Sequence, residues 1–132
     1  MKLALFLSLL ALSVSSSAAQ DSPAYSSCTS KAKTQTELNV CASEEASRAD
    51  AESDAAFHAL LSKAAADSEA LEKIQIAESA WRAYREAFVD AMYPAKDKQA
   101  AYGSIYPMKV DLLRAEFARE HLAALKKLSQ QY

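Results

Sequence analysis

The scarcity of helix-breaking residues constrains this chain more than any other feature of its sequence. Among 132 residues there is one glycine, Gly103, and there are three prolines, Pro23, Pro94 and Pro107. The remainder is rich in alanine, leucine, glutamate and lysine, which have high intrinsic helix propensities. No stretch alternates between apolar and polar residues over a useful length, as a half-buried strand would. The chain is therefore predicted to be all-α.

Three long helices are predicted from capping signals and from apolar spacing. The first begins at a capping box formed by Thr34 and Glu37, and its pattern continues to about residue 64. The second is capped by Asp67 or Ser68 and ends before Pro94, because a proline restricts the residue before it as well as itself. The third begins near the last proline, which suits a first-turn position. We expect a small bundle of three main helices.

Each predicted helix carries a stripe at steps of three and four residues that is expected to face the core. In the first helix the stripe is apolar at its ends, whereas acidic residues, Glu45 among them, crowd its middle. In the second helix the stripe comprises Leu71, Ile74, Ala77, Trp81, Tyr84, Phe88 and Met92. In the third helix it comprises Val110, Leu113, Phe117, His121, Ala124 and Leu128.

The N-terminal residues predict export. Lys2 is followed by an apolar run over residues 3–14 and then by small residues. This order matches a secretory signal peptide, and the run is too short for a transmembrane helix. The predicted division is a signal peptide over residues 1–19, a leader segment over 20–33 and a helical domain over 34–132. A lipoprotein would need a cysteine directly after the apolar run, so a periplasmic or secreted protein without a membrane span is expected.

The charge balance argues against some classes of partner. The chain has 15 basic and 17 acidic residues, which gives a net charge of −2 at pH 7. Nucleic acids and anionic membrane surfaces attract basic proteins, so neither is expected as a partner. A mildly acidic protein suits a cationic partner instead. The sequence leaves the oligomeric state open.

The two cysteines, Cys28 and Cys41, are predicted to form a disulfide. An even number of cysteines at short separation in an exported chain is typical of a structural bridge. Closing a loop of this size contributes roughly 3 kcal/mol by restricting the unfolded chain. Redox catalysis favours a C-x-x-C spacing, which this pair lacks. The bridge is therefore interpreted as a staple that ties the leader segment to the first helix.

The sequence predicts no catalytic, cofactor or metal site. It has no G-x-S-x-G or P-loop motif, and a single glycine cannot build a phosphate cradle. Asp50, Asp54 and His58 follow one another at steps of four and could bind a metal from one helix face. The same spacing arises readily in any acidic helix, and no further ligand motif supports a metal. We interpret these residues as solvated helix surface and expect that the protein is not an enzyme.

The stretch AESAWRAYREAF, residues 77–88, contains the only tryptophan of the chain. Trp81 lies on the apolar stripe, so we expect it to anchor the core rather than to form an exposed platform for a ligand. Arg85 borders the same face and would need a carboxylate there. The available carboxylates are those of Asp50, Asp54 and Glu78. Arg82 and Glu86 are four residues apart and are expected to pair on the surface.

Several segments together have the order and spacing of a known family. An opening cysteine is followed by the segment TQTELNVCA over residues 34–42, then by the AESAWRAYRE block and by YGSIYPM before the last helix. These segments resemble the bacterial family whose shared domain is named after the lysozyme inhibitor LprI, from Cys28 to about Leu125. The residues that carry the match are Asp50, Trp81, Tyr84, Arg85, Gly103 and Ser104.

The resemblance implies a periplasmic or secreted inhibitor that binds lysozyme and protects the peptidoglycan. The alternative is a small exported helical module that binds another envelope protein or ligand and does not inhibit lysozyme. For contact with a partner we expect a protruding loop over residues 93–106 with an unstructured reach, and an acidic surface that attracts a cationic enzyme. The candidate partner-binding residues are Tyr93, Tyr102, Tyr106, Glu44, Glu45 and Asp54.

The chain also departs from the pattern that this family usually shows. Asp54 and Glu78 stand where the pattern has asparagine and glutamine, and His121 stands where it has arginine. A second cysteine pair of the family falls on Val89 and Leu113. The fold is expected to survive these changes.

Overall fold

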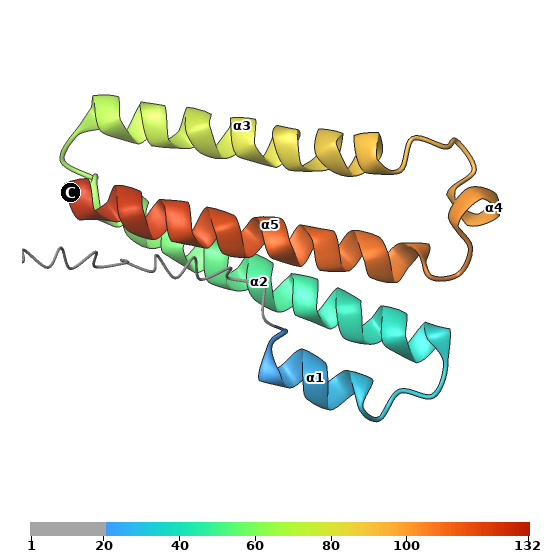
Figure 1. Ribbon diagram of the computed structural model, residues 1–132. Helices are drawn as coiled ribbons and strands as arrows, with labels where there is room; N and C mark the ends of the chain where they lie inside the picture. Colours follow the sequence, from blue (N-terminus) through green and yellow to red (C-terminus); the bar gives the residue numbers. More distant parts are fainter. Residues whose placement is uncertain (1–20) are drawn as a thin grey trace, which may run out of the picture.

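The computed structural model describes residues 21–132, so the predicted signal peptide lies outside the described residues (Figure 1). The described part of the chain is helical and contains no strand, which confirms the predicted fold class. Its elements are α1 (Pro23–Thr29), α2 (Gln35–Lys63), α3 (Ser68–Met92), α4 (Lys98–Tyr102), α5 (Tyr106–Leu128) and a final 3₁₀ turn, η1 (Ser129–Gln131). None of these helices is both long enough and apolar enough to cross a membrane.

The predicted starts of the two longest helices are confirmed. The Thr34 hydroxyl accepts the N–H of Glu37 at 3.2 Å, and the Glu37 carboxylate accepts the N–H of Lys33 and of Thr34 at 2.6 and 2.9 Å. These backbone hydrogen bonds hold the pKa of Glu37 below its ordinary value. At α3 the N-cap is Asp67, whose side chain accepts the N–H of Ala70 at 3.0 Å.

Two short helices were not expected. In α1 the side chain of Ser22 caps the helix by accepting the N–H of Tyr25 at 3.0 Å, and Pro23 stands in the first turn. In α4 the cap is Asp97, and Gly103 ends the helix with a φ of 70° that favours glycine. The connection between α3 and α5 is thus structured, and the predicted unstructured reach of residues 93–106 is wrong.

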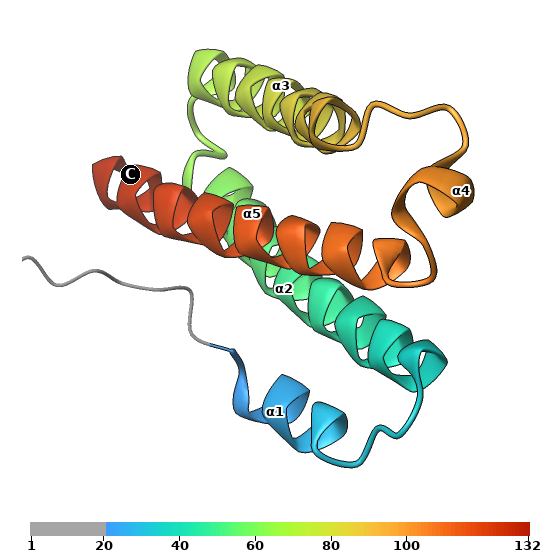
Figure 2. The ribbon, with the colours of Figure 1, turned by 45° about the vertical axis from the view of Figure 1, so that its right-hand side comes forward.

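The centre of the bundle is the close pair of α2 and α5. Their contact consists of four buried alanines, Ala46, Ala49, Ala115 and Ala118, which let the two helices approach closely. Helix α3 lies along one side of this pair and α1 lies on the other side (Figures 1 and 2). A disulfide joins Cys28 of α1 to Cys41 of α2, with their Cα atoms 5.7 Å apart, which confirms the predicted bridge.

Two further apolar clusters lie against α2, one near each end of the helix. One lies at the α2–α3 turn and comprises Leu60, Ala64, Ala70, Ile74 and Leu125. The other lies under α1 and comprises Tyr25, Cys41 and Ala42. The predicted stripe of α3 is only partly buried, because Tyr84 and Met92 are 56% and 52% exposed. The α3 residues that are fully covered include Ile74, Glu78 and Val89, and one of these is charged.

Candidate functional site

Trp81 packs in the interface between α3 and α5. Its indole stacks on the imidazole of His121, with ring centroids 3.8 Å apart and ring planes at 7°. The guanidinium carbon of Arg85 lies 4.9 Å from the indole centroid, within the range of a cation–π contact. The ring is half-buried by these contacts. Trp81 therefore anchors α3 to α5, and its face is covered by other side chains instead of being free for a ligand.

Arg85 joins α3 to α2. Its side chain is 11% exposed, and its Nη1 donates to Oδ1 of Asp50 at 2.7 Å. Its Nε donates to Oε1 of Glu86 at 3.0 Å. The expectation that this arginine needs a carboxylate is confirmed, and Asp50 is the partner on the facing helix.

The expected surface pair between Arg82 and Glu86 is wrong. Arg82 turns toward α2 and donates to Oδ1 of Asp54 at 2.6 Å, while its Nε lies 2.8 Å from Oε1 of Glu78. Glu86 instead accepts from Nη2 of Arg114 on α5 at 2.7 Å, and this hydrogen bond is the main cause of its lowered pKa. A pair four residues apart on one helix is worth only a few tenths of a kcal/mol, so charged groups on facing helices outcompete it.

Glu78 and His121 form a covered pair that the sequence analysis did not anticipate. The Glu78 carboxylate is buried, and its Oε2 lies 2.7 Å from Nε2 of His121. The imidazole side chain is itself only 11% exposed. A buried carboxylate needs hydrogen-bond donors, and here the donors come from His121 and Arg82. The available signals were His121 on the predicted stripe of the last helix and Glu78, which follows Ile74 by four residues and so shares its face of α3.

Glu45 is the most enclosed charge of the acid run, which is the set of acidic residues from Glu44 to Asp54 on α2. It is 2% exposed and accepts hydrogen bonds from Ser22 at 2.6 Å, from Arg48 at 2.7 Å and from Arg119 of α5. Burial alone would raise the pKa of Glu45, but the hydrogen bonds from Ser22 and Arg48 and the charges of Arg119 and Arg48 hold it below its ordinary value. Glu45 therefore does not belong to the exposed acidic surface in which it was predicted.

The rest of the acid run is divided between ion pairs and solvent. Asp50 and Asp54 each pair with a different arginine of α3, so neither is a free charge. Glu44 and Glu52 are exposed, and within residues 21–132 they take part in no ion pair. Of the five acidic residues from Glu44 to Asp54, only Glu44 and Glu52 are thus both exposed and outside any ion pair within the described residues.

The three tyrosines of the α3–α5 connection pack against one another. The ring of Tyr93 lies 5.2 Å from that of Tyr102 and 5.3 Å from that of Tyr106, both in edge contacts. The hydroxyl of Tyr102 accepts the N–H of Ala95 at 3.1 Å. In the adjoining loop the carbonyl of Ser104 accepts a hydrogen bond from Nδ2 of Asn39 at 3.0 Å, and this bond attaches the connection to α2. A role of these half-buried rings in partner binding stays a prediction.

A surface groove of about 650 Å³ lies between α1 and the N-terminal half of α2. The Cys28–Cys41 disulfide and Ala32 contribute to its lining, together with Val40, which is 52% exposed. Its charged residues are Lys31, Glu37, Glu44 and Arg48. Nothing in the sequence pattern marked this groove, because α1 was expected to be an irregular leader.

The family of this chain is decided by one comparison. A family model described as "Lysozyme inhibitor LprI" matches residues 27–125. The chain belongs to the LprI family. The comparisons with curated proteins and with solved structures give no match. The LprI match runs from α1 to the last turns of α5, so it includes the disulfide, the Trp81 block and all three long helices.

The buried ionisable side chains of this LprI domain form structural contacts between helices. Within the described residues, no group of three or more histidine, cysteine, aspartate or glutamate side chains is placed to hold a metal ion. The buried charges, Glu45 and Glu78, are each held by cationic or polar partners on neighbouring elements. The description of the matching family names an inhibitor.

Proposed function

We propose that this protein is exported to the cell envelope, where it binds and inhibits lysozyme and thereby protects the peptidoglycan. The observation that carries the proposal is the match of residues 27–125 to a family described as a lysozyme inhibitor. Export is supported by the apolar run near the N-terminus and by the Cys28–Cys41 disulfide, since disulfides persist in oxidising compartments.

The physical requirements of such an inhibitor are a rigid scaffold and a surface that complements the enzyme. Rigidity is supported by the alanine contact of α2 with α5 and by the disulfide. Complementarity to a cationic enzyme is supported by Glu44 and Glu52, which are exposed on α2. Unpaired acidic groups of this kind accelerate the encounter with a basic partner more than they increase affinity.

The test is an inhibition assay with the purified protein lacking residues 1–19. It is titrated into peptidoglycan suspensions that are being hydrolysed by lysozymes of several types, one type at a time. We expect inhibition at micromolar concentration or below. Association should slow as salt rises, because the Debye length falls from about 10 Å at 0.1 M to about 3 Å at 1 M.

The matched variant is Glu44→Gln combined with Glu52→Gln. It should slow association at low salt, because both side chains are exposed and take part in no ion pair within the described residues. Failure of the unmodified protein to inhibit any lysozyme type would contradict the proposal. The alternative of a binding module for another envelope component would then take its place.

A further inference from the structure

We propose that the groove between α1 and α2 is the surface that holds lysozyme, and that it accepts an apolar side chain of the enzyme flanked by two cationic side chains. This inference rests on the proposed function and names the contact site for it. The surface is called the α1–α2 groove below.

The groove combines concavity with an exposed apolar floor. Its volume of about 650 Å³ falls inside the range of about 300–1,000 Å³ that is usual for binding pockets. Val40 is 52% exposed there and lies beside the disulfide. Among residues 21–132, the other large apolar residues that are exposed to this extent, Ile76, Tyr84 and Met92, lie on α3. A partner side chain in the groove would bury Val40, and the apolar contact would add to the affinity.

The charges around Val40 select a cationic partner. Glu37 and Glu44 stand on α2 three residues before and four residues after it, so they are about 10 Å apart along the helix. The backbone hydrogen bonds that lower the pKa of Glu37 keep it anionic. Arg48 also lines the groove, but its guanidinium pairs with buried Glu45.

One lysine opposes these two acids. Lys31 lies two residues after the end of α1 and lines the groove, and within the described residues it takes part in no ion pair. The α2 wall therefore carries two acids that take part in no ion pair within the described residues, and the opposite wall carries a single cation. An anionic partner would meet Glu37 and Glu44 on either side of Val40. A partner with lysine or arginine on both sides of an apolar residue would pair with both acids.

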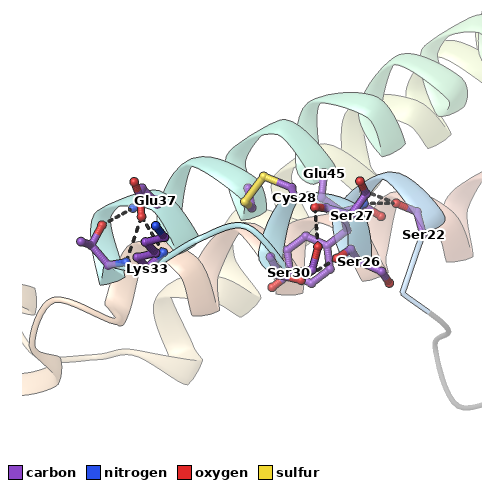
Figure 3. The surroundings of a disulfide bond; sticks show 12 residues. Ser22, Ser26, Ser27, Cys28, Ser30, Lys33, Glu37 and Glu45 are labelled. Atoms are coloured by element: carbon purple, nitrogen blue, oxygen red, sulfur yellow. Dashed lines mark hydrogen bonds between the residues drawn. A yellow bond between two sulfur atoms is a disulfide. The ribbon is translucent and has the colours of Figure 1, made fainter.

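The walls of the groove are fixed before binding. The disulfide joins them directly, and Tyr25 of α1 is buried against α2. Figure 3 shows this disulfide between the Glu37 cap and the hydrogen bond from Ser22 to Glu45. A preformed surface loses little conformational freedom on binding, so more of the contact energy is retained as affinity.

The experiment compares Val40→Arg with Ala55→Arg. Both positions are exposed on α2, and both changes add the same charge, but Ala55 does not line the groove. We expect Val40→Arg to raise the inhibition constant at least tenfold, because it fills the groove and repels a cationic side chain. Ala55→Arg should change it less than about threefold, through reduced attraction alone. Equal melting temperatures of the two variants establish that the fold is intact.

The outcomes separate this inference from the proposed function. If the unmodified protein inhibits lysozyme and both variants inhibit equally well, the groove is not the contact surface, although the proposed function stands. If the unmodified protein inhibits no lysozyme, both proposals fail. Should Val40→Arg not fold, hydrogen exchange on the unmodified protein decides the question. Lysozyme should slow amide exchange in residues 24–48, and protection confined to other helices would overturn the inference.

Discussion

Replacement of Glu45 by glutamine tests whether one buried carboxylate holds α1 and α5 on α2. Glu45 is 2% exposed and accepts hydrogen bonds from Ser22, Arg48 and Arg119, which lie on three different parts of the chain. Glutamine has nearly the same shape, but it is neutral and has one acceptor oxygen where the carboxylate has two. The change therefore removes the charge and leaves the two arginines competing for one oxygen.

The magnitude follows from the exposure of the partners. Removing one member of a fully buried ion pair costs about 3–5 kcal/mol. Here the side chains of Arg48 and Arg119 are 39% and 34% exposed, so both can regain water and the cost is smaller. We expect Glu45→Gln to lower the free energy of unfolding by about 2–3 kcal/mol at neutral pH, or the melting temperature by about 10 °C.

The assay is urea denaturation followed by circular dichroism, with Glu44→Gln as the matched control. Glu44 is the neighbouring residue and is exposed, so its replacement should change the free energy of unfolding by less than about 0.5 kcal/mol. Equal stability of the two variants at neutral pH would refute the reasoning, because it would mean that the buried charge contributes nothing beyond an exposed one.

The pH dependence gives an independent check with a definite sign. Because the pKa of Glu45 is lowered on folding, the unfolded chain binds its proton more readily than the folded chain does. The stabilisation is therefore present above the pKa of the unfolded state and is lost as the pH falls through the pKa of the folded state. The stability gap between the unmodified protein and Glu45→Gln should narrow on acidification over that window.

Three further perturbations address the disulfide, the α3–α5 connection and the α3–α5 interface. Replacing Cys28 and Cys41 by serine should lower the free energy of unfolding by about 3 kcal/mol in urea denaturation, and a loss below about 1 kcal/mol would count against the staple. Tyr102→Phe removes the hydroxyl that accepts the N–H of Ala95, so it should lower the free energy of unfolding by about 1 kcal/mol and speed amide exchange at Ala95. Unchanged exchange at Ala95 would contradict the contact. Introducing cysteine at both Val89 and Leu113 should give a second disulfide, because we expect their Cα atoms to lie within about 7 Å of each other. Two thiols that still titrate after oxidation would show that the second cysteine pair of the family does not fall on these positions.

The long helices could be predicted because their signals are local. A capping box at Thr34 and a cap at Asp67 fix where α2 and α3 begin, and both caps depend only on residues within one turn. Helices as short as α1 and α4 are not stable by themselves, so their formation depends on contacts from elsewhere in the chain. In α1 those contacts are the disulfide and the burial of Tyr25, and in α4 they involve the tyrosine rings.

The choice of ion-pair partners was predictable only in part. Arg85 was expected to find a carboxylate because it borders a covered face, and Asp50 supplies it. Arg82 was assigned to Glu86 on spacing within one helix, but its actual partners include Asp54 of α2. The spacing of residues along one helix does not show how that helix is rotated about its axis relative to its neighbours. That rotation decides which of several nearby carboxylates an arginine reaches.

Three of the positions at which we expect this chain to depart from the family pattern lie together in the folded protein. They come from three different helices: Asp54 lies on α2, Glu78 on α3 and His121 on α5. Arg82 pairs with both Asp54 and Glu78, and Glu78 also contacts His121. A glutamate at position 78 places a charge where only 6% of the residue is exposed, which is tolerable only if donors face it. The imidazole of His121 supplies one donor and, being flat, also stacks on Trp81 at 3.8 Å. Each of these residues thus supplies what another requires, and together with Arg82 they attach α3 to α2 and α5.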